Sequence, residues 1–129
     1  MTYLSKPGLG LVGAYQVSGI PFATSSLAVP ATGSALYISF PRVTRTIIVT
    51  NTISGSNALR LGFSELGVTV GTNYYVVLGG ETITTDVKCT GIYLSSDTGT
   101  PISASVLAEL TFIETQELPN NWSGSLGVG

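Results

Sequence analysis

Histidine is absent from this chain of 129 residues, and cysteine occurs once, at Cys89. Without histidine the chain has no Ser-His or Cys-His catalytic pair, and it lacks the commonest metal ligand. A single cysteine excludes an internal disulfide and leaves too few ligands for a zinc site. We therefore expect a protein that is not an enzyme and that holds no cofactor and no metal.

Charge is also scarce, since charged residues make up 9% of the chain against about 25% in an average protein. The five basic residues are scattered and outnumbered by seven acidic ones, so no nucleic-acid partner is expected. No apolar run approaches the roughly 20 residues of a membrane span, and the first ten residues lack a secretory signal pattern. The sequence thus predicts an intracellular protein with a neutral surface that packs readily against neighbours.

Four carboxylates are candidates for the acid-base chemistry that glycosidases use: Glu65, Glu81, Asp86 and Glu109. Glu109 falls on the polar side of a predicted strand, and the other three fall on turns or polar faces. We interpret all four as surface residues rather than as a catalytic pair.

Apolar and polar residues alternate along much of the chain with the period of two that is typical of β-strands. The pattern is clearest in residues 102–112, where six apolar residues occupy every second position. Residues 43–52 follow the same pattern with many β-branched side chains, which disfavour a helix. Further strands are predicted at 14–18, 35–40, 58–63, 74–78, 81–89 and 92–94, while 22–29 is either a strand or a long loop.

Turn-forming residues separate these segments and suggest how they connect. The cluster at 53–57 follows one strand and precedes another, so we interpret residues 40–63 as a β-hairpin. Gly79 and Gly80 predict the turn of a second hairpin. Residues 64–72 are expected to form an exposed loop.

About eight strands with no segment of helical period predict an all-β fold. We expect an antiparallel two-sheet β-sandwich, most simply a single jelly roll, with an open barrel as the alternative. The sandwich should occupy residues 14–113, between non-regular arms at 1–13 and 114–129.

The predicted strands define an expected core and one awkward charge. Nine residues should be buried between the sheets: Ile47, Val49, Leu59, Leu61, Phe63, Val106, Ala108, Leu110 and Phe112. Arg45 shares the side of Ile47 and Val49, and an unpaired buried guanidinium is very costly. We therefore expect Arg45 at the end of a sheet, close to a carboxylate or to several carbonyl groups.

Both arms are apolar, although they lack strand periodicity. Their large apolar residues are Leu4, Leu9, Leu11, Leu118, Trp122, Leu126 and Val128. A sandwich with its own core has little room for them, and exposed apolar surface usually marks an interface. We expect these residues to contact other subunits; the alternative for residues 1–13 is an ordered edge of the domain itself.

Tyr74 and Tyr75, together with Trp122, are candidates for stacking against a sugar ring. Adjacent residues of a strand point to opposite faces, so at most one of the two tyrosines can join such a platform. The sequence therefore predicts a single stacking tyrosine in any glycan site of this strand.

Six stretches carry the general style of the chain: V-T-R-T-I-I-V-T-N-T (43–52), L-R-L-G-F-S-E-L-G-V (59–68), N-Y-Y-V-V-L (73–78), G-E-T-I-T-T-D-V-K (80–88), I-Y-L (92–94) and A-S-V-L-A-E-L-T-F-I (104–113). This sequence resembles small single jelly-roll capsid proteins of icosahedral double-stranded DNA viruses, including their vertex (penton) proteins. The likeness lies in the Thr/Ser/Gly-rich strands, the few charges and the apolar arms, and it includes no diagnostic motif.

The resemblance implies a structural virion protein without catalytic residues, a penton or minor capsid protein assembled inside the host cell. It implies other capsid proteins as partners, arms that serve as anchors, and a homo-oligomer for which a pentamer is preferred and a trimer is next. The chain is small for this family, and a capsid cement or decoration protein is similarly plausible. The alternative from another class is a glycan-binding β-sandwich module, such as a tail or fibre tip.

Overall fold

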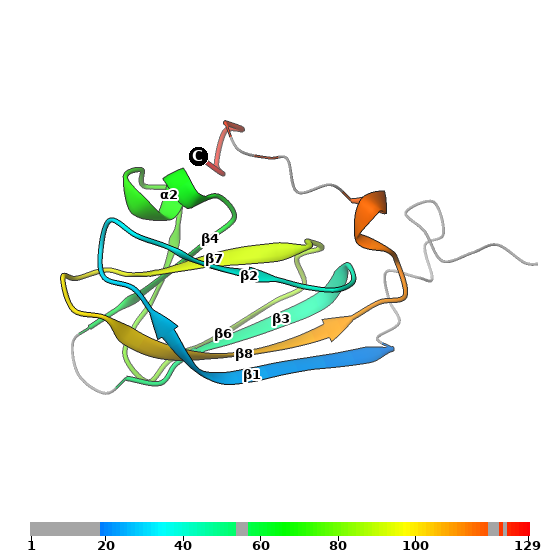
Figure 1. The fold of residues 1–129 in the computed structure, drawn as a ribbon, viewed down its shortest axis with the longest axis horizontal. Coiled ribbons are helices and arrows are strands. Elements are labelled where there is room, and N and C mark those ends of the chain that lie inside the picture. Colours follow the sequence, from blue (N-terminus) through cyan, green and yellow to red (C-terminus); the bar gives the residue numbers. More distant parts are fainter. Residues whose placement is uncertain (1–18, 54–56, 119–121, 123) are drawn as a thin grey trace, which may run out of the picture.

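The computed structural model describes residues 19–53, 57–118, 122 and 124–129. These residues form two antiparallel four-stranded sheets packed face to face (Figure 1). In spatial order, sheet A contains β1 (Ile20–Val29), β8 (Ile102–Leu110), β3 (Thr44–Asn51) and β6 (Thr82–Thr85). Sheet B contains β2 (Leu36–Ser39), β7 (Gly91–Ser96), β4 (Leu59–Gly62) and β5 (Tyr75–Val77). The prediction of an all-β, two-sheet sandwich of about eight strands is confirmed.

The strand order is that of one long antiparallel ribbon folded over on itself. Its four pairs are β1 with β8, β2 with β7, β3 with β6 and β4 with β5, and only the last joins two consecutive strands that share a sheet. From β1 to β4, and again from β5 to β8, each strand lies in the other sheet from the strand before it. The described strands therefore form two separate sheets and not the open barrel that was the alternative.

Both predicted hairpins are wrong. β3 lies in sheet A and β4 in sheet B, so these two consecutive strands belong to different sheets and do not form a hairpin. Gly79 and Gly80 likewise join β5 of sheet B to β6 of sheet A, with Gly80 at φ +81°. Turn-forming residues suit either connection, and alternation within a strand defines its faces but not its partner.

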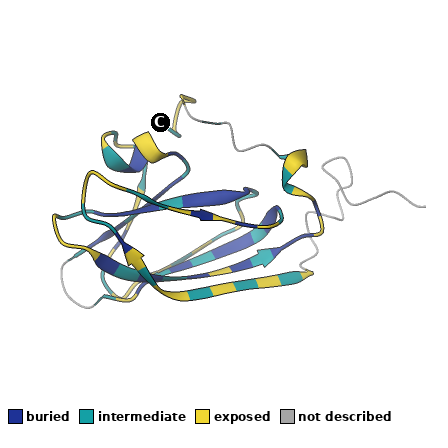
Figure 2. Ribbon diagram, in the orientation of Figure 1, coloured by how far each residue is buried: buried dark blue, intermediate teal, exposed yellow. Residues whose placement is uncertain are grey.

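The core lies between the sheets, and Figure 2 shows buried residues along their facing sides. Seven of the nine predicted core residues are buried: Ile47, Val49, Leu59, Leu61, Val106, Ala108 and Leu110. Phe63 is only partly buried, because it lies at the margin of the core against Trp122. Alternation thus predicted most of the inward faces correctly.

The alternation of β8 breaks after Leu110, and this leaves Phe112 outside the core. Thr111 is fully buried next to Leu110, and its hydroxyl donates to the Val43 carbonyl at 2.8 Å. The phase of the chain changes at that point, so Ile113 is buried and Phe112 is 53% exposed. The predicted burial of Phe112 is therefore wrong.

Arg45 lies near the start of β3 in a β-bulge. The register against β8 shifts between Thr44 and Thr46, so Arg45 is an extra residue and both threonines are buried instead. Its guanidinium contacts the Glu109 carboxylate at 2.7 Å, with both side chains 39% exposed. The expected carboxylate partner is confirmed, whereas the inward side assigned to Arg45 is wrong because period two does not survive a bulge.

The remaining predicted segments can be compared with the structure one by one. Residues 22–29 belong to strand β1, which carries a register shift between Thr24 and Leu27. The expected loop at 64–72 contains a short helix, α2 (Glu65–Thr69), whose N-cap Ser64 accepts a hydrogen bond from the Gly67 amide. A 3-10 turn, η1 (Thr115–Glu117), follows β8. The predicted strand at 14–18 and the arm at 1–13 lie outside the described residues.

Leu110→Ala tests the assignment of the core. This side chain is fully buried, so its truncation is expected to lower the free energy of unfolding by about 2 to 5 kcal/mol through lost burial and a residual cavity. Leu107→Ala, on the same strand but 42% exposed, is the matched control and should cost less than about 1 kcal/mol. Urea unfolding followed by circular dichroism gives both values, and equal costs would contradict the inward face assigned to β8.

Candidate binding groove

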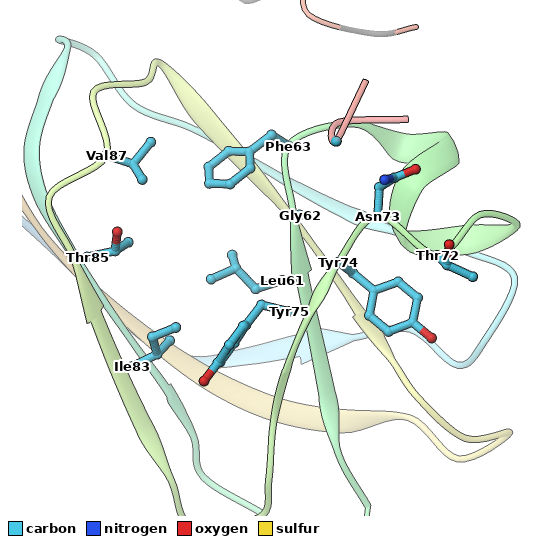
Figure 3. Close-up of a pocket in the computed structure, with 11 residues that line it drawn as sticks. Leu61, Gly62, Phe63, Thr72, Asn73, Tyr74, Tyr75, Ile83, Thr85 and Val87 are labelled. Carbon is cyan, nitrogen blue, oxygen red and sulfur yellow. The ribbon is translucent and has the colours of Figure 1, made fainter. Parts of the chain in front are cut away.

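A groove of about 450 Å³ lies between the two sheets on the side where β5 and β6 are the edge strands (Figure 3). Its lining contains no charged side chain. The lining residues are Leu61, Gly62, Phe63, Thr72, Asn73, Tyr74, Tyr75, Ile83, Thr85, Val87 and Gly127. The groove is therefore a neutral and mainly apolar opening into the margin of the core.

The walls of the groove come from both sheets. Ile83 and Val87 lie on one side, and Leu61 and Phe63 of the β4 segment lie on the other (Figure 3). β5 has three residues and β6 has four, so these edge strands cover little of the space between the layers. Ile83, Val87 and Phe63 consequently remain partly exposed instead of being sealed in the core.

Tyr74, which precedes β5, and Tyr75, its first residue, point in different directions. Figure 3 shows Tyr75 directed toward Ile83 across the groove and Tyr74 directed away from it. Tyr75 is 60% exposed, whereas the ring centroid of Tyr74 lies 4.3 Å from the guanidinium carbon of Arg60. Stacking of a ligand on either residue stays a prediction, and the geometry favours Tyr75 as the accessible ring.

Arg60 lies on β4, next to Leu61 of the groove lining, and supports the rim of the groove. Its side chain is only 13% exposed, and its Nε donates to the Asp97 carboxylate at 2.7 Å. A second guanidinium nitrogen donates to the Val68 carbonyl at 3.0 Å. Through these contacts and the Tyr74 ring, Arg60 connects β4, the turn after β7, the α2 helix and the segment that leads into β5.

The C-terminal segment packs against its own sandwich. Trp122 contacts Phe63 edge to face, with ring centroids 6.2 Å apart. Ser64 Oγ donates to the Val128 carbonyl at 2.8 Å, and the same carbonyl lies so close to Gly67 that a Cβ at this position would clash with it. The tail thus lies beside α2, where Gly127 forms part of the groove wall.

This packing qualifies the expected roles of the arms. Trp122 does find room on its own chain, and Leu118 and Val128 are partly buried, whereas Leu126 is fully exposed. Contact of these four residues with other subunits stays a prediction. The remaining arm residues, Leu4, Leu9 and Leu11, lie outside the described part of the chain.

Cys89 belongs to the core and not to a surface site. Its side chain is fully buried beside the Thr44 hydroxyl, and burial raises the pKa of the thiol above its ordinary value. The thiol is therefore held in the neutral form that does not act as a nucleophile. Within the described ranges, no cluster of three or more His, Cys, Asp or Glu side chains is arranged to hold a metal ion.

The four carboxylates considered as catalytic candidates each have a different local partner or position. Asp86 accepts a hydrogen bond from the Thr46 hydroxyl at 2.9 Å, and Glu81 accepts one from the Leu78 amide at 3.1 Å. Glu109 pairs with Arg45, while Glu65 occupies the first turn of α2.

Among the described helices, none is long and apolar enough to span a membrane.

Sequence reasoning identified part of the groove without recognising it as one. Leu61 and Phe63 were expected in the core, and Ile83 and Val87 share one side of the strand that was predicted at 81–89. Alternation places these apolar residues on one side of their strands, but it does not show where the two sheets separate at their edges. Asn73, Thr85 and Gly127 carry no sequence signal that connects them, because only the pairing of β5 and β6 with different sheets brings them together.

Replacing Arg60 tests the support of the groove rim. Arg60→Met removes the partner of Asp97 and of the Val68 carbonyl, and it is expected to lower the free energy of unfolding by about 1 to 3 kcal/mol. Arg45→Met is the control, because the pair of Arg45 and Glu109 is more exposed and should contribute less than about 1 kcal/mol. Urea denaturation measures both, and a smaller loss for Arg60→Met than for Arg45→Met would refute the supporting role.

Comparison with known proteins found no family model that matches the chain. The chain also matches no curated protein and no solved structure. Its function is therefore inferred from its own residues and their arrangement.

Proposed function

We propose that this chain is a structural virion protein, a penton or minor capsid protein that assembles into an icosahedral shell by packing. The observation that carries the proposal is the folded-ribbon strand order, which we assign to a single jelly roll. Jelly rolls build viral capsids as well as lectin and cupin domains. The character of the surface favours the first of these roles.

The outer face of sheet A supports a packing role because it is nearly neutral. The hydroxyl oxygens of Thr50 and Thr82 lie 2.8 Å apart and satisfy each other across neighbouring strands. The ion pair of Arg45 and Glu109 cancels the charge of both side chains. Leu107 is 42% exposed on β8. Such a face offers little electrostatic resistance to a second copy that approaches closely.

The end of the sandwich beside α2 supports the same role with exposed apolar side chains. Leu66 and Val70 of the α2 region are 57% and 80% exposed, and Leu126 of the adjacent tail is fully exposed. Figure 1 shows the C-terminal residues next to α2. Clustered apolar surface of this kind usually marks an interface. We assign this end of the molecule to contacts with other shell proteins.

Within this proposal the assembly is a symmetric homo-oligomer, with a pentamer preferred and a trimer next, located in the virion capsid and built inside the host cell. The preference for five copies follows from the family resemblance. A capsid cement or decoration protein would use the same neutral faces and exposed apolar end. The two roles differ in the proteins that the chain contacts.

Native mass spectrometry of the full chain tests the proposal. With rising concentration, the 13.3 kDa chain is expected to give closed oligomers of one defined copy number. Leu107→Glu, which adds a charge to the exposed face of sheet A, should weaken assembly. Leu107→Gln is its uncharged control. A chain that stays monomeric at every concentration, and forms no rings or shells in electron micrographs, would contradict a role in a shell.

The exposed ring of Tyr75 favours one second candidate, a glycan-binding β-sandwich module such as a tail or fibre tip. Because the groove is mainly apolar and lacks charged groups, we expect a glycan array to show no binding above background. Strong binding that is lost in Tyr75→Ala and retained in Tyr74→Ala would overturn this expectation and favour the module. Trp122→Ala provides a further comparison, because Trp122 packs against Phe63 of the groove wall.

A further inference from the structure

We propose that the groove between β5 and β6 receives residues 8–13 of a neighbouring copy, so that copies are linked head to tail. This inference rests on the proposed assembly of the chain into a shell, and it names the surfaces that meet. The occupant is a segment of this chain, supplied by another molecule.

The groove has the chemistry of a receptor for an uncharged apolar segment. Ile83 and Val87 face Leu61 and Phe63 across it, and no lysine, arginine, aspartate or glutamate is part of its lining. A volume of about 450 Å³ is open to a few side chains. A charged segment would lose its hydration there without gaining an ionic partner.

The edges of the groove also offer backbone hydrogen bonds. Within the described residues, β5 pairs only with β4 and β6 pairs only with β3. The outer edge of each strand therefore presents amide and carbonyl groups that an added extended segment can bond. Tyr75, which is 60% exposed at this edge, would be covered by such a segment.

Residues 8–13, G-L-G-L-V-G, match this receptor in charge and in shape. In an extended segment Leu9 and Leu11 fall on one side, and Gly8, Gly10 and Val12 fall on the other. The leucines can enter the groove while the glycine side allows close approach of the two backbones. The C-terminal arm already contacts its own molecule, where Gly127 lines the groove and the Val128 carbonyl accepts a hydrogen bond from the Ser64 hydroxyl.

The position of β1 favours a neighbouring copy as the source of the segment. Gly19, which follows the N-terminal segment, donates to the Leu110 carbonyl at 2.8 Å and thus lies at the start of β1. β1 and β6 are the opposite edges of sheet A, three strand spacings apart, which is about 14 Å. When copies pack side by side in one direction, the β1 edge of one copy faces the groove of the next. Repetition of this heterologous contact gives a ring when the rotation between successive copies closes, and an open filament when it does not.

Disulfide trapping between two different full-length variants tests the proposal. Leu9→Cys protein is mixed with Thr85→Cys protein and treated with a mild oxidant, while the native Cys89 is left in place because it is fully buried. Any bond that links positions 9 and 85 in this mixture joins two molecules. Thr84→Cys is the matched control, because it is the adjacent and exposed residue of β6 and does not line the groove. We expect about tenfold more linked product with Thr85→Cys, since docking raises the effective concentration of the two thiols.

The outcomes separate this inference from the proposed function. Equal or absent linkage in both mixtures, with oligomers intact by native mass spectrometry, overturns the groove as receptor and leaves the shell role standing. A Leu9→Cys/Thr85→Cys double variant that links only within single chains overturns donation by a neighbour. A chain that never assembles overturns both. Ile83→Lys, checked for folding by circular dichroism, should abolish the linkage, and unchanged linkage in this variant also counts against the proposal.

Discussion

The buried amide of Asn51 holds together the two places where the chain crosses between the sheets. Its side-chain nitrogen donates to the Asn57 carbonyl at 3.1 Å and to the Val77 carbonyl at 3.0 Å, while its oxygen accepts from the Ile53 amide at 3.1 Å. Its backbone carbonyl also accepts from Gly80 at 2.9 Å. Asn51 is fully buried, so loss of these partners would leave several polar groups unsatisfied in the core. One side chain thus joins the end of β3 to both crossings.

The hydrogen bonds of Asn51 help to determine where the two sheets are held together and where a gap remains between them. Next to Asn51, the ends of β3 and β5 are tied directly to each other. Farther along the same edge, β5 and β6 are too short to seal the layers, and the groove extends toward Phe63 and Val87. The C-terminal tail limits the groove at Gly127. The neutral opening is therefore a consequence of the folded-ribbon topology, in which the last strand of each sheet has a partner on one side.

The sequence predicted local structure better than pairing. Val106, Ala108 and Leu110 were correctly assigned to the core, because alternation reports directly which side of a strand is apolar. Arg45 and Phe112 were assigned to the wrong side, because a bulge and a strand end each change the phase by one residue. The hairpins were wrong because a turn-rich segment can remain in one sheet or cross to the other. The groove could not be predicted, since it exists only once β5 and β6 are known to belong to different sheets.

Packing of neighbouring copies through the β5/β6 edge is the central claim of this account, and amide hydrogen exchange measures it without any substitution. The full chain is compared as a dilute monomer and as a concentrated assembly. The account predicts that assembly slows exchange at the edge strands, in Tyr75–Val77 and in Thr82–Thr85, because their outer backbone groups become covered. Assembly that leaves exchange at both strands unchanged, with new protection confined to other surfaces, would contradict it.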